Sequence, residues 1–165
     1  MNKIQFQETQ RFNQWWVWIL LIVIFGFTVQ PIWETYQSGI SLSSSQLWGF
    51  VILSLVILLF LILRLETKID EKGVWVKYFP VHWKPKFYSW DSISQIEVKK
   101  YSPLMDYGGW GIRLGRNGKA YNVKGNKGLQ LLLKNGDGLL IGTQKDEELE
   151  RVMNKLNADL LLKKN

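Results

Sequence analysis

The sequence predicts two membrane-spanning helices followed by a small, mainly β domain that ends in a helix. Three observations lead to this fold class. Two long uncharged apolar segments lie before residue 66, and short alternating segments separated by glycine-containing turns follow them. The C-terminal segment then repeats apolar residues with the period of a helix. A chain of 165 residues has room for one such domain beside the two helices.

The two apolar segments, residues 15–33 and 47–63, contain no charged residue. A helix over residues 15–33 spans roughly 28 Å at about 1.5 Å per residue, which is close to the hydrocarbon thickness of a bilayer. The rest of the chain is too short to bury two such helices in water, so we expect a transmembrane hairpin over residues 15–65. A cleaved signal peptide is the alternative for the first segment. Because no small-x-small cleavage site follows it, we expect the segment to be retained.

The residues that flank the spans predict their orientation. Aromatic residues lie at both ends, with Trp15, Trp16 and Trp18 at one end and Trp33, Tyr36 and Trp48 at the other. Basic residues flank only the outer ends of the hairpin, namely Lys3, Arg11, Arg64 and Lys68. The connecting loop, residues 34–46, contains no Lys or Arg. The positive-inside rule therefore predicts an external loop and a cytoplasmic location for both the N-terminal segment 1–14 and the domain 66–165.

From residue 66 onward, eight short segments have the composition of β-strands. They are residues 67–70, 74–79, 86–90, 95–101, 110–114, 119–124, 129–134 and 139–143. Many short strands at regular spacing predict a sandwich or a small barrel. Leu149, Val152, Met153, Leu156 and Leu160 then form one face of a helix over residues 145–163, with Thr143 as its N-cap. We expect this face to close one end of the barrel, and a helix lying on the membrane surface is the alternative.

A glycine-rich stretch, residues 107–125, raises the question of nucleotide binding. Gly109, Gly111 and Gly115 look like a phosphate-binding loop, but such a loop requires a helix directly after it. Strand-like residues flank these glycines on both sides, so we predict a hairpin with its turn at residues 116–118. Gly108 and Gly109 are expected to supply positive φ angles, and Gly111 is expected to allow close approach of another backbone or ring.

Composition restricts the chemistry. The chain has no cysteine and a single histidine, His82, so we predict no catalytic, metal or cofactor site. From Arg64 onward there are 19 Lys and Arg against 12 Asp and Glu, whereas two of each precede it, so the net charge of +7 belongs to the C-terminal domain. A basic domain suits an anionic membrane surface or nucleic acid, and a basic surface that only aids solubility is the plainer alternative.

Chain connectivity predicts which loops face the membrane. The second span continues almost directly into the first strand, so the start of that strand must lie close to the bilayer. If successive strands alternate in direction, the loops at residues 80–85, 102–109 and 124–128 return to the same side. The predicted lipid or partner contacts are Trp83, Lys84, Lys86, Leu104, Met105, Lys124 and Lys127. In the alternative interpretation Trp83 and Met105 are core residues and the lysines are merely solvated. Separately, Arg113 is a possible anion contact, and a structural role, as a cation stacked on the Trp110 indole or in an ion pair, is favoured for it.

The order of the elements, together with GGWGIR at residues 108–113 and IGTQ at residues 141–144, resembles an uncharacterised family of small bacterial membrane proteins. Members have two spans and a cytoplasmic pleckstrin-homology-like domain, and the resemblance covers residues 47–165. It implies a bacterial inner-membrane location and a bent sheet or small barrel of about seven antiparallel strands capped by a C-terminal helix. Segments 86–90 and 95–101 would then merge. The basic loop of lipid-binding members of that fold is here only Glu71-Lys72-Gly73, which argues against an inositol-phosphate pocket.

These observations predict a membrane-tethered, non-enzymatic binding or adaptor module. It would contact anionic lipid headgroups, an unidentified protein partner, or both. A membrane-anchored nucleic-acid-binding protein is the second interpretation, but it lacks a recognition motif. An enzyme or a transporter accessory subunit is the third, and formation of a homo-oligomer is left open.

Overall fold

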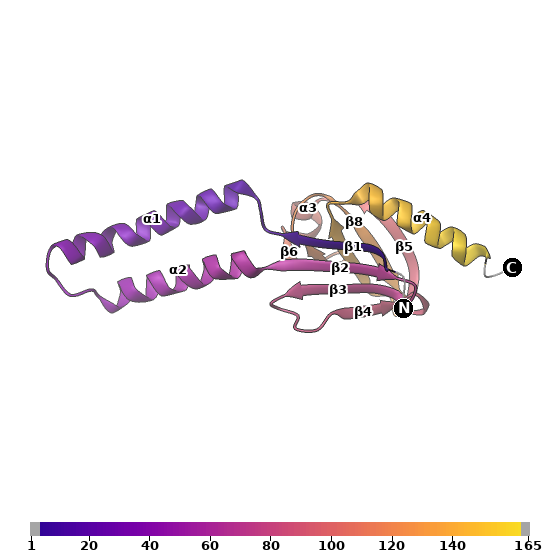
Figure 1. Ribbon diagram of the computed structural model, residues 1–165, viewed down its shortest axis with the longest axis horizontal. Helices are drawn as coiled ribbons and strands as arrows, with labels where there is room; N and C mark the ends of the chain where they lie inside the picture. The colour runs from indigo at the N-terminus through magenta and orange to yellow at the C-terminus, as the bar shows by residue number, and fades with distance from the viewer. Residues whose placement is uncertain (1–3, 163–165) are drawn as a thin grey trace. The chain divides into compact units, whose positions relative to one another are not determined.

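A computed structural model describes residues 4–162 of the chain (Figure 1). The chain divides into a helical unit, residues 12–63, and a β unit built from the segments on either side of it. Lys3, one of the predicted flanking charges, and residue 163, the predicted end of the last helix, lie outside the described residues.

The helical unit is a hairpin of α1 (Trp15–Gln37) and α2 (Ser44–Ile62), both long and apolar enough to cross a membrane. Residues 38–43 connect them, so the connection is shorter than the predicted loop 34–46. Ser43 and Gln46 form a capping box at the start of α2, which fixes where that helix begins. The helices pack through the ring pairs Phe12–Phe60 and Phe25–Phe50, whose centroids lie 5.5 and 5.9 Å apart.

The first sheet contains β1 (Ile4–Arg11), β2 (Arg64–Asp70), β3 (Gly73–Phe79) and β4 (Lys86–Ser89), in that order and all antiparallel. The strand β1 was not predicted, because the N-terminal segment 1–14 was expected to lie apart from the domain. Instead, Arg11 at the end of β1 pairs with Arg64 at the start of β2. The helical unit is thus an insertion between two neighbouring strands.

The second sheet follows a short 3₁₀ helix, η1 (Trp90–Ser92). It contains β5 (Ile93–Lys100), β6 (Gly111–Gly115), β7 (Gly118–Asn122), β8 (Lys127–Leu133) and β9 (Gly138–Thr143). Their order is β5-β8-β9-β7-β6, and β7 runs parallel to β9. All eight predicted strands are present. The expected merger of segments 86–90 and 95–101 is wrong, because η1 separates β4 from β5 and the Trp90 N–H donates to the Lys72 carbonyl.

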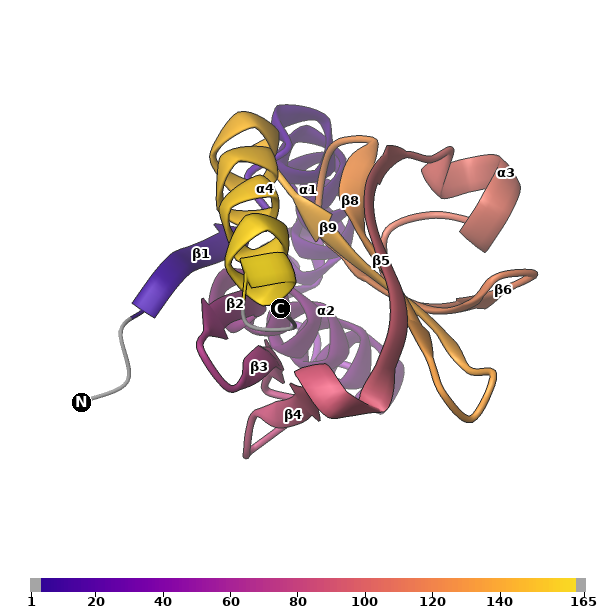
Figure 2. The same cartoon turned by 90° about the vertical axis from the view of Figure 1, so that its right-hand side faces the viewer.

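The core lies between the two sheets, which do not close into a barrel. Leu65, Ile69 and Val76 of the first sheet and Leu131 and Ile141 of the second are almost fully buried. The last helix, α4 (Asp146–Leu162), packs against β1 and β5 (Figure 2) through the buried residues Leu149, Met153 and Leu156. It therefore covers an open side of the two-sheet core rather than the end of a barrel. The side chain of Leu160, predicted on the same face, lies outside the described residues.

The glycine-rich stretch is a helix-to-hairpin connection. A short helix, α3 (Pro103–Tyr107), ends at Gly108, and both Gly108 and Gly109 have the predicted positive φ. No helix follows Gly115, since β7 begins at Gly118, so the hairpin prediction is confirmed. The close approach expected at Gly111 is wrong. It occurs instead at Gly118, where a Cβ atom would overlap the backbone of Gly138.

Candidate functional site

The predicted contact residues are mostly solvent-exposed. The exposed fraction is 79% for Trp83, 64% for Leu104 and 86% for Met105, so the alternative in which Trp83 and Met105 are core residues is wrong. The three other exposed members are Lys84, Lys86 and Lys124. Lys127 is also exposed, but its ammonium group is ion-paired with the carboxylate of Asp146 at the start of α4. The side chains of Trp83 and Met105 are therefore available for contacts outside the chain.

The structure separates these residues into two groups. One consists of Trp83, Lys84 and Lys86, in and beside the loop that connects β3 to β4. The other is built from α3 and the loop before β8, which are joined because the Trp110 indole N–H donates to the Gly125 carbonyl at 3.2 Å. In Figure 1, α3 and the β3–β4 connection lie toward the end of the β unit where β2 begins, and Figure 2 shows them apart from one another across it.

Arg113, the predicted anion contact, is exposed on β6. Its Nε donates to the carbonyl oxygen of Trp110 at 3.0 Å, so part of its guanidinium already stabilises the start of this hairpin. The cations that lie over aromatic rings in the described part of the chain are Arg64, Lys77 and Lys119. The predicted stacking of Arg113 on the Trp110 indole is therefore not observed among these residues, and an anion contact stays a prediction.

The loop connecting β3 to β4, residues 80–85, begins next to the start of β2, because Phe79 pairs with Arg64. His82 fastens this loop to the core. Its N–H donates to the Tyr78 carbonyl at 2.7 Å, its Nδ1 accepts the Tyr78 N–H at 3.3 Å, and its ring meets the Tyr121 ring edge-on at 5.3 Å. Val81 and Trp83, on either side of His82, are exposed. The loop is thus anchored by one side chain while its apolar neighbours face outward.

Burial and neighbouring positive charges keep His82 uncharged. Burial lowers the pKa of His82 below its ordinary value, and the positive charges of Lys86 and Lys119 lower it further. The imidazole is therefore neutral near pH 7 and accepts the Tyr78 N–H. Its geometry is that of a structural residue.

Two cations and two rings gather at this end of the first sheet. The Arg64 guanidinium lies 5.0 Å from the centroid of the Phe79 ring, and the Lys77 ammonium lies 5.5 Å from the same centroid. The Trp83 ring meets Phe79 edge-on at 6.1 Å. Cations near an aromatic face are stabilised by about 0.5–1 kcal/mol at exposed sites. The arrangement places positive charge and an exposed indole at the point where β2 begins.

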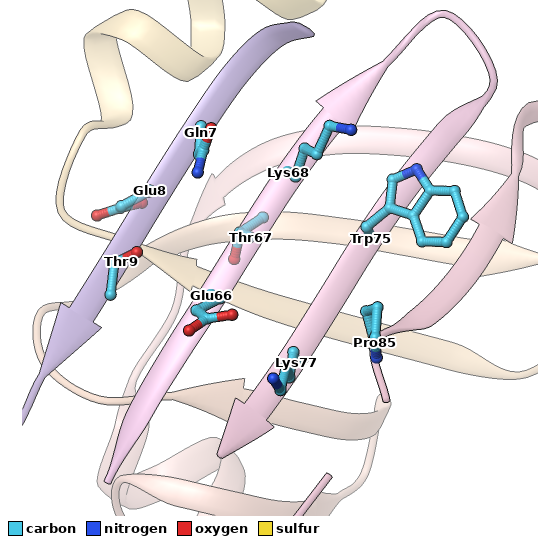
Figure 3. Close-up of a pocket in the computed structure, with 9 residues that line it drawn as sticks. All are labelled: Gln7, Glu8, Thr9, Glu66, Thr67, Lys68, Trp75, Lys77 and Pro85. Carbon is cyan, nitrogen blue, oxygen red and sulfur yellow. The ribbon is translucent and has the colours of Figure 1, made fainter. Parts of the chain in front are cut away.

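The outer face of the first sheet carries a groove of about 470 Å³, shown in Figure 3. We call it the outer-sheet groove. It crosses β1, β2 and β3 and is lined by Gln7, Glu8, Thr9, Glu66, Thr67, Lys68, Trp75, Lys77 and Pro85. Glu8 and Thr67 contribute mainly backbone, since their side chains are buried on the inner face. This groove was not predicted from the sequence, because one of its walls is the unpredicted strand β1.

The indole of Trp75 forms a fixed wall of the groove. Its Nε1–H donates to Asp70 Oδ2 at 3.0 Å, and its ring stacks on Phe87 with centroids 4.2 Å apart and planes inclined by 31°. Burial of Asp70 opposes its ionisation. The N–H groups of Lys72 and Gly73, the Lys68 ammonium and the Trp75 indole nevertheless hold its pKa below the ordinary value. The ionised carboxylate therefore orients both the β2–β3 turn and the indole.

The strand β1 is fastened to the core by polar groups. Glu8, which is only 5% exposed, accepts hydrogen bonds from the Thr143 hydroxyl at 2.7 Å and from the Gln144 N–H at 2.8 Å. Gln10 donates to the Gly142 carbonyl at 2.6 Å. Thr143, the predicted N-cap, accepts the Lys145 N–H at 3.0 Å, and α4 begins at Asp146. These bonds tie the N-terminal strand to the corner between β9 and α4.

These features define a β-rich module of two sheets and a C-terminal helix, into which two apolar helices are inserted. Comparisons with protein-family models, curated proteins and solved structures found no match for this chain. In the part of the chain that the structure describes, no three His, Asp or Glu side chains gather as a metal site would require. The features of the β unit that bear on function are therefore the loop 80–85, the outer-sheet groove and the connections between the strands.

Proposed function

We propose that the chain is a membrane-anchored, non-enzymatic binding module at the cytoplasmic face of a bacterial inner membrane. In this proposal α1 and α2 cross the bilayer as a hairpin, and both termini are cytoplasmic. The observation that carries it is the pairing of β1 with β2. The segments before and after the hairpin share one sheet, so they lie in the same compartment, and two crossings satisfy this requirement. Cleavage after the first span would remove β1 from the sheet.

The side chains of the helical unit support the bilayer crossing. Among its residues only a few apolar side chains are buried, such as Val17, Leu21 and Leu53. Large apolar residues are exposed on all sides of both helices. A helix that is apolar all round requires either a large protein core or lipid around it. Arg11 and Arg64 at its two ends and the uncharged connection 38–43 support the cytoplasmic placement of the β unit.

The loop 80–85 is the proposed contact with the lipid surface. It begins beside Arg64, which only Leu63 separates from the end of α2. Trp83 is suited to the headgroup region, where an indole has both apolar and polar surroundings. Lys84 and Lys86 would each gain about 1 kcal/mol near an anionic leaflet. The second exposed group, Leu104 and Met105 with Lys124, is the proposed contact for a protein partner.

A pleckstrin-homology-like fold is part of the proposal. Two packed sheets and a C-terminal helix support it. The extra N-terminal strand and the second-sheet order β5-β8-β9-β7-β6 are departures from the seven-stranded arrangement that the resemblance implies.

Because the chain contains no cysteine, single-cysteine variants test the topology directly. Ser41→Cys lies between α1 and α2, and Lys134→Cys lies at the end of the β8–β9 hairpin. A membrane-impermeant maleimide is expected to label position 41 in intact cells and position 134 only after the cells are permeabilised. Labelling of both positions from outside, or of position 134 alone, would overturn the proposed topology.

Spin labels test the lipid contact in the reconstituted full chain. A label at Lys84 is expected to respond to lipid-soluble oxygen more strongly than a matched label at Arg116, which lies in the turn between β6 and β7. Equal, fully aqueous behaviour of the two labels would show that the loop 80–85 does not contact lipid.

A further inference from the structure

We propose that the outer-sheet groove binds the headgroup of an anionic glycolipid, a sugar ring that carries a negative charge. The inference rests on the membrane anchoring proposed above and adds a ligand class to it. It is carried by four features of the groove: its size, its distance along β2 from the hairpin, its indole wall and its charge.

The size of the groove suits one small polar group. Its volume of about 470 Å³ falls within the range of roughly 300–1,000 Å³ that is typical of small-ligand sites. Gln7 and Thr9 of β1 form one side and Pro85 forms the other, while Trp75 and Lys68 lie together toward one end (Figure 3). The ring of a single sugar with its substituents is a group of this scale.

The connection of β2 to α2 favours a lipid-linked ligand in the outer-sheet groove. Only Leu63 separates the end of α2 from Arg64. At about 3.3 Å per residue, Glu66 and Lys68 lie roughly 7 and 13 Å along β2 from Arg64. If α2 crosses the bilayer, the groove is within reach of a headgroup that projects from the same leaflet. Confinement of both partners to one surface raises the effective concentration of the ligand.

The side chains that line the groove are suited to binding a sugar ring rather than a peptide. The Trp75 indole is held flat by Asp70 on its edge and Phe87 on its face, so it presents a fixed plane. Gln7 and Thr9 are exposed and, among the described residues, have no side-chain hydrogen-bond partner. Amide and hydroxyl groups beside an aromatic plane suit the alternating hydroxyls and C–H face of a sugar.

A peptide is a poorer fit to the same surface. An added strand requires an unpaired sheet edge, whereas β2 and β3, which form most of the groove floor, are already paired on both sides. The groove also lacks a deep apolar pocket for a side-chain anchor, because its neighbouring walls are Glu66, Lys68 and Lys77.

The ion pairs of the groove leave one of its lysines able to contact an anionic ligand. Lys68 is paired with Asp70 at 3.4 Å, and Glu66 is paired with Arg64 at 2.6 Å. Lys77 has no carboxylate partner among the described residues, and its ammonium lies over the Phe79 ring. Lys77 is therefore available to contact a negatively charged group of a ligand, whereas the carboxylate of Glu8 is already bonded to Thr143 and Gln144 on the inner face. Glu66 remains able to accept a hydrogen bond from a sugar hydroxyl.

The test measures lipid binding by the full chain in detergent micelles, using native mass spectrometry. Three probes with matched acyl chains separate the contributions: glucuronosyl diacylglycerol, phosphatidylglycerol of the same charge, and uncharged glucosyl diacylglycerol. Glucuronosyl diacylglycerol is expected to bind about tenfold more tightly than either of the others, a difference of about 1.4 kcal/mol. Equal binding of the glucuronosyl lipid and phosphatidylglycerol would overturn the inference.

Variants locate the binding. Trp75→Leu and Lys77→Gln are each expected to reduce the affinity for the glucuronosyl lipid about tenfold, with less than a twofold change for phosphatidylglycerol. Gln7→Ala, at an exposed position, provides a milder change of about threefold in a chain whose folding is not in question. Unchanged affinity in Lys77→Gln and Gln7→Ala would place the lipid elsewhere. Leu114→Ala, at an exposed position on β6 outside both the groove and the loop 80–85, is the matched control, and it should leave the affinities for all three lipids unchanged.

A soluble probe separates the two sources of the same headgroup. Methyl glucuronide, which lacks the lipid, is expected to bind about a hundredfold more weakly than the lipid. Equal affinity would identify a soluble sugar acid as the ligand and overturn the lipid assignment. Loss of headgroup selectivity with correct cysteine labelling would reject this inference alone, whereas incorrect labelling would reject the proposed function as well.

Discussion

The helical unit and the β unit treat their apolar side chains in opposite ways. In the β unit, Leu65, Val76 and Ile141 are almost completely buried between two sheets. In the helical unit, residues of the same kinds, such as Leu55 and Ile22, are more than half exposed. This contrast is the one that the proposed placement predicts, with the β unit in water and the helical unit in hydrocarbon. The contrast also shows that the boundary between them falls within a few residues of Arg11 and Arg64.

The largest test of this contrast removes the helical unit. Because Arg11 and Arg64 are paired neighbours, residues 12–63 can be replaced by Asn-Gly, the sequence of a two-residue hairpin turn. This variant is expected to be soluble without detergent and cooperatively folded. A fragment that starts at Arg64 lacks Phe6 and the rest of β1, and should be destabilised by at least about 3–5 kcal/mol. Thermal unfolding followed by circular dichroism compares them, and equal stability would show that β1 is dispensable.

The next largest effect is expected from a charge in α2, which should weaken the insertion of this helix into the membrane. Leu55→Arg places a guanidinium near the middle of α2, at a position that is 59% exposed. Insertion of the helix should then cost about 2.5–3.5 kcal/mol more than in the native chain, because the charge is transferred into hydrocarbon. The fraction of chain that resists alkaline extraction from membranes measures this, with Leu55→Ala as the matched control. An unaffected Leu55→Arg chain would indicate that α2 is in water.

A change in the β unit should affect stability in a pH-dependent way. Asp70→Asn removes a buried carboxylate that accepts from Lys72, Gly73 and the Trp75 indole, and should cost about 1–2 kcal/mol near neutral pH. The pKa of Asp70 is lower in the folded than in the unfolded chain, so its ionisation stabilises the fold above its ordinary value of 3.8. That stabilisation is lost as the pH falls through the folded pKa.

The difference in unfolding free energy between native and Asp70→Asn chains should consequently shrink below about pH 4. Denaturant titrations at several pH values in detergent micelles measure it. A difference that is constant down to pH 2, or one that grows, would contradict the role assigned to this carboxylate.

The smallest expected effect on stability is that of Trp83→Ala. Because the indole is 79% exposed, its removal should change the free energy of unfolding by less than about 0.5 kcal/mol. In the variant without residues 12–63, it should nevertheless weaken association with anionic vesicles several-fold, with Leu114→Ala as an equally exposed control. A large loss of stability would show that Trp83 belongs to the fold rather than to the lipid contact.

The sequence was sufficient to predict a helix or strand where a single pattern of apolar residues dominates the segment. The two apolar helices and eight strands follow from runs of uncharged residues and from alternation between turns. The strand β1 was missed because its inward-facing positions after Phe6 are Glu8 and Gln10, so the alternation that identifies a half-buried strand is absent. Polar partners on β9 and after it bury these side chains, and a local pattern does not contain that information.

The helix α3 was missed although its signals were present. Ser102 caps it, Pro103 occupies its first turn and Gly108 ends it, but at five residues it is too short to show a period. The exposed loop 80–85 was predicted because connectivity alone places it beside Arg64. The outer-sheet groove was not, since its walls come from three strands whose order and register are set by long-range pairing.

The position of β1 in the chain also limits the order in which its contacts can form during synthesis. The hydrogen-bond partners of this strand at Gly142 and Thr143 are separated from it by 132 and 135 residues along the chain. Contacts of such separation form late. The N-terminal strand can pair with β2 once residues 64–70 have been made, whereas its bonds to Gly142 and Thr143 require nearly all of the β unit. The bonds that fasten β1 to the corner between β9 and α4 therefore form after the pairing of β1 with β2 becomes possible.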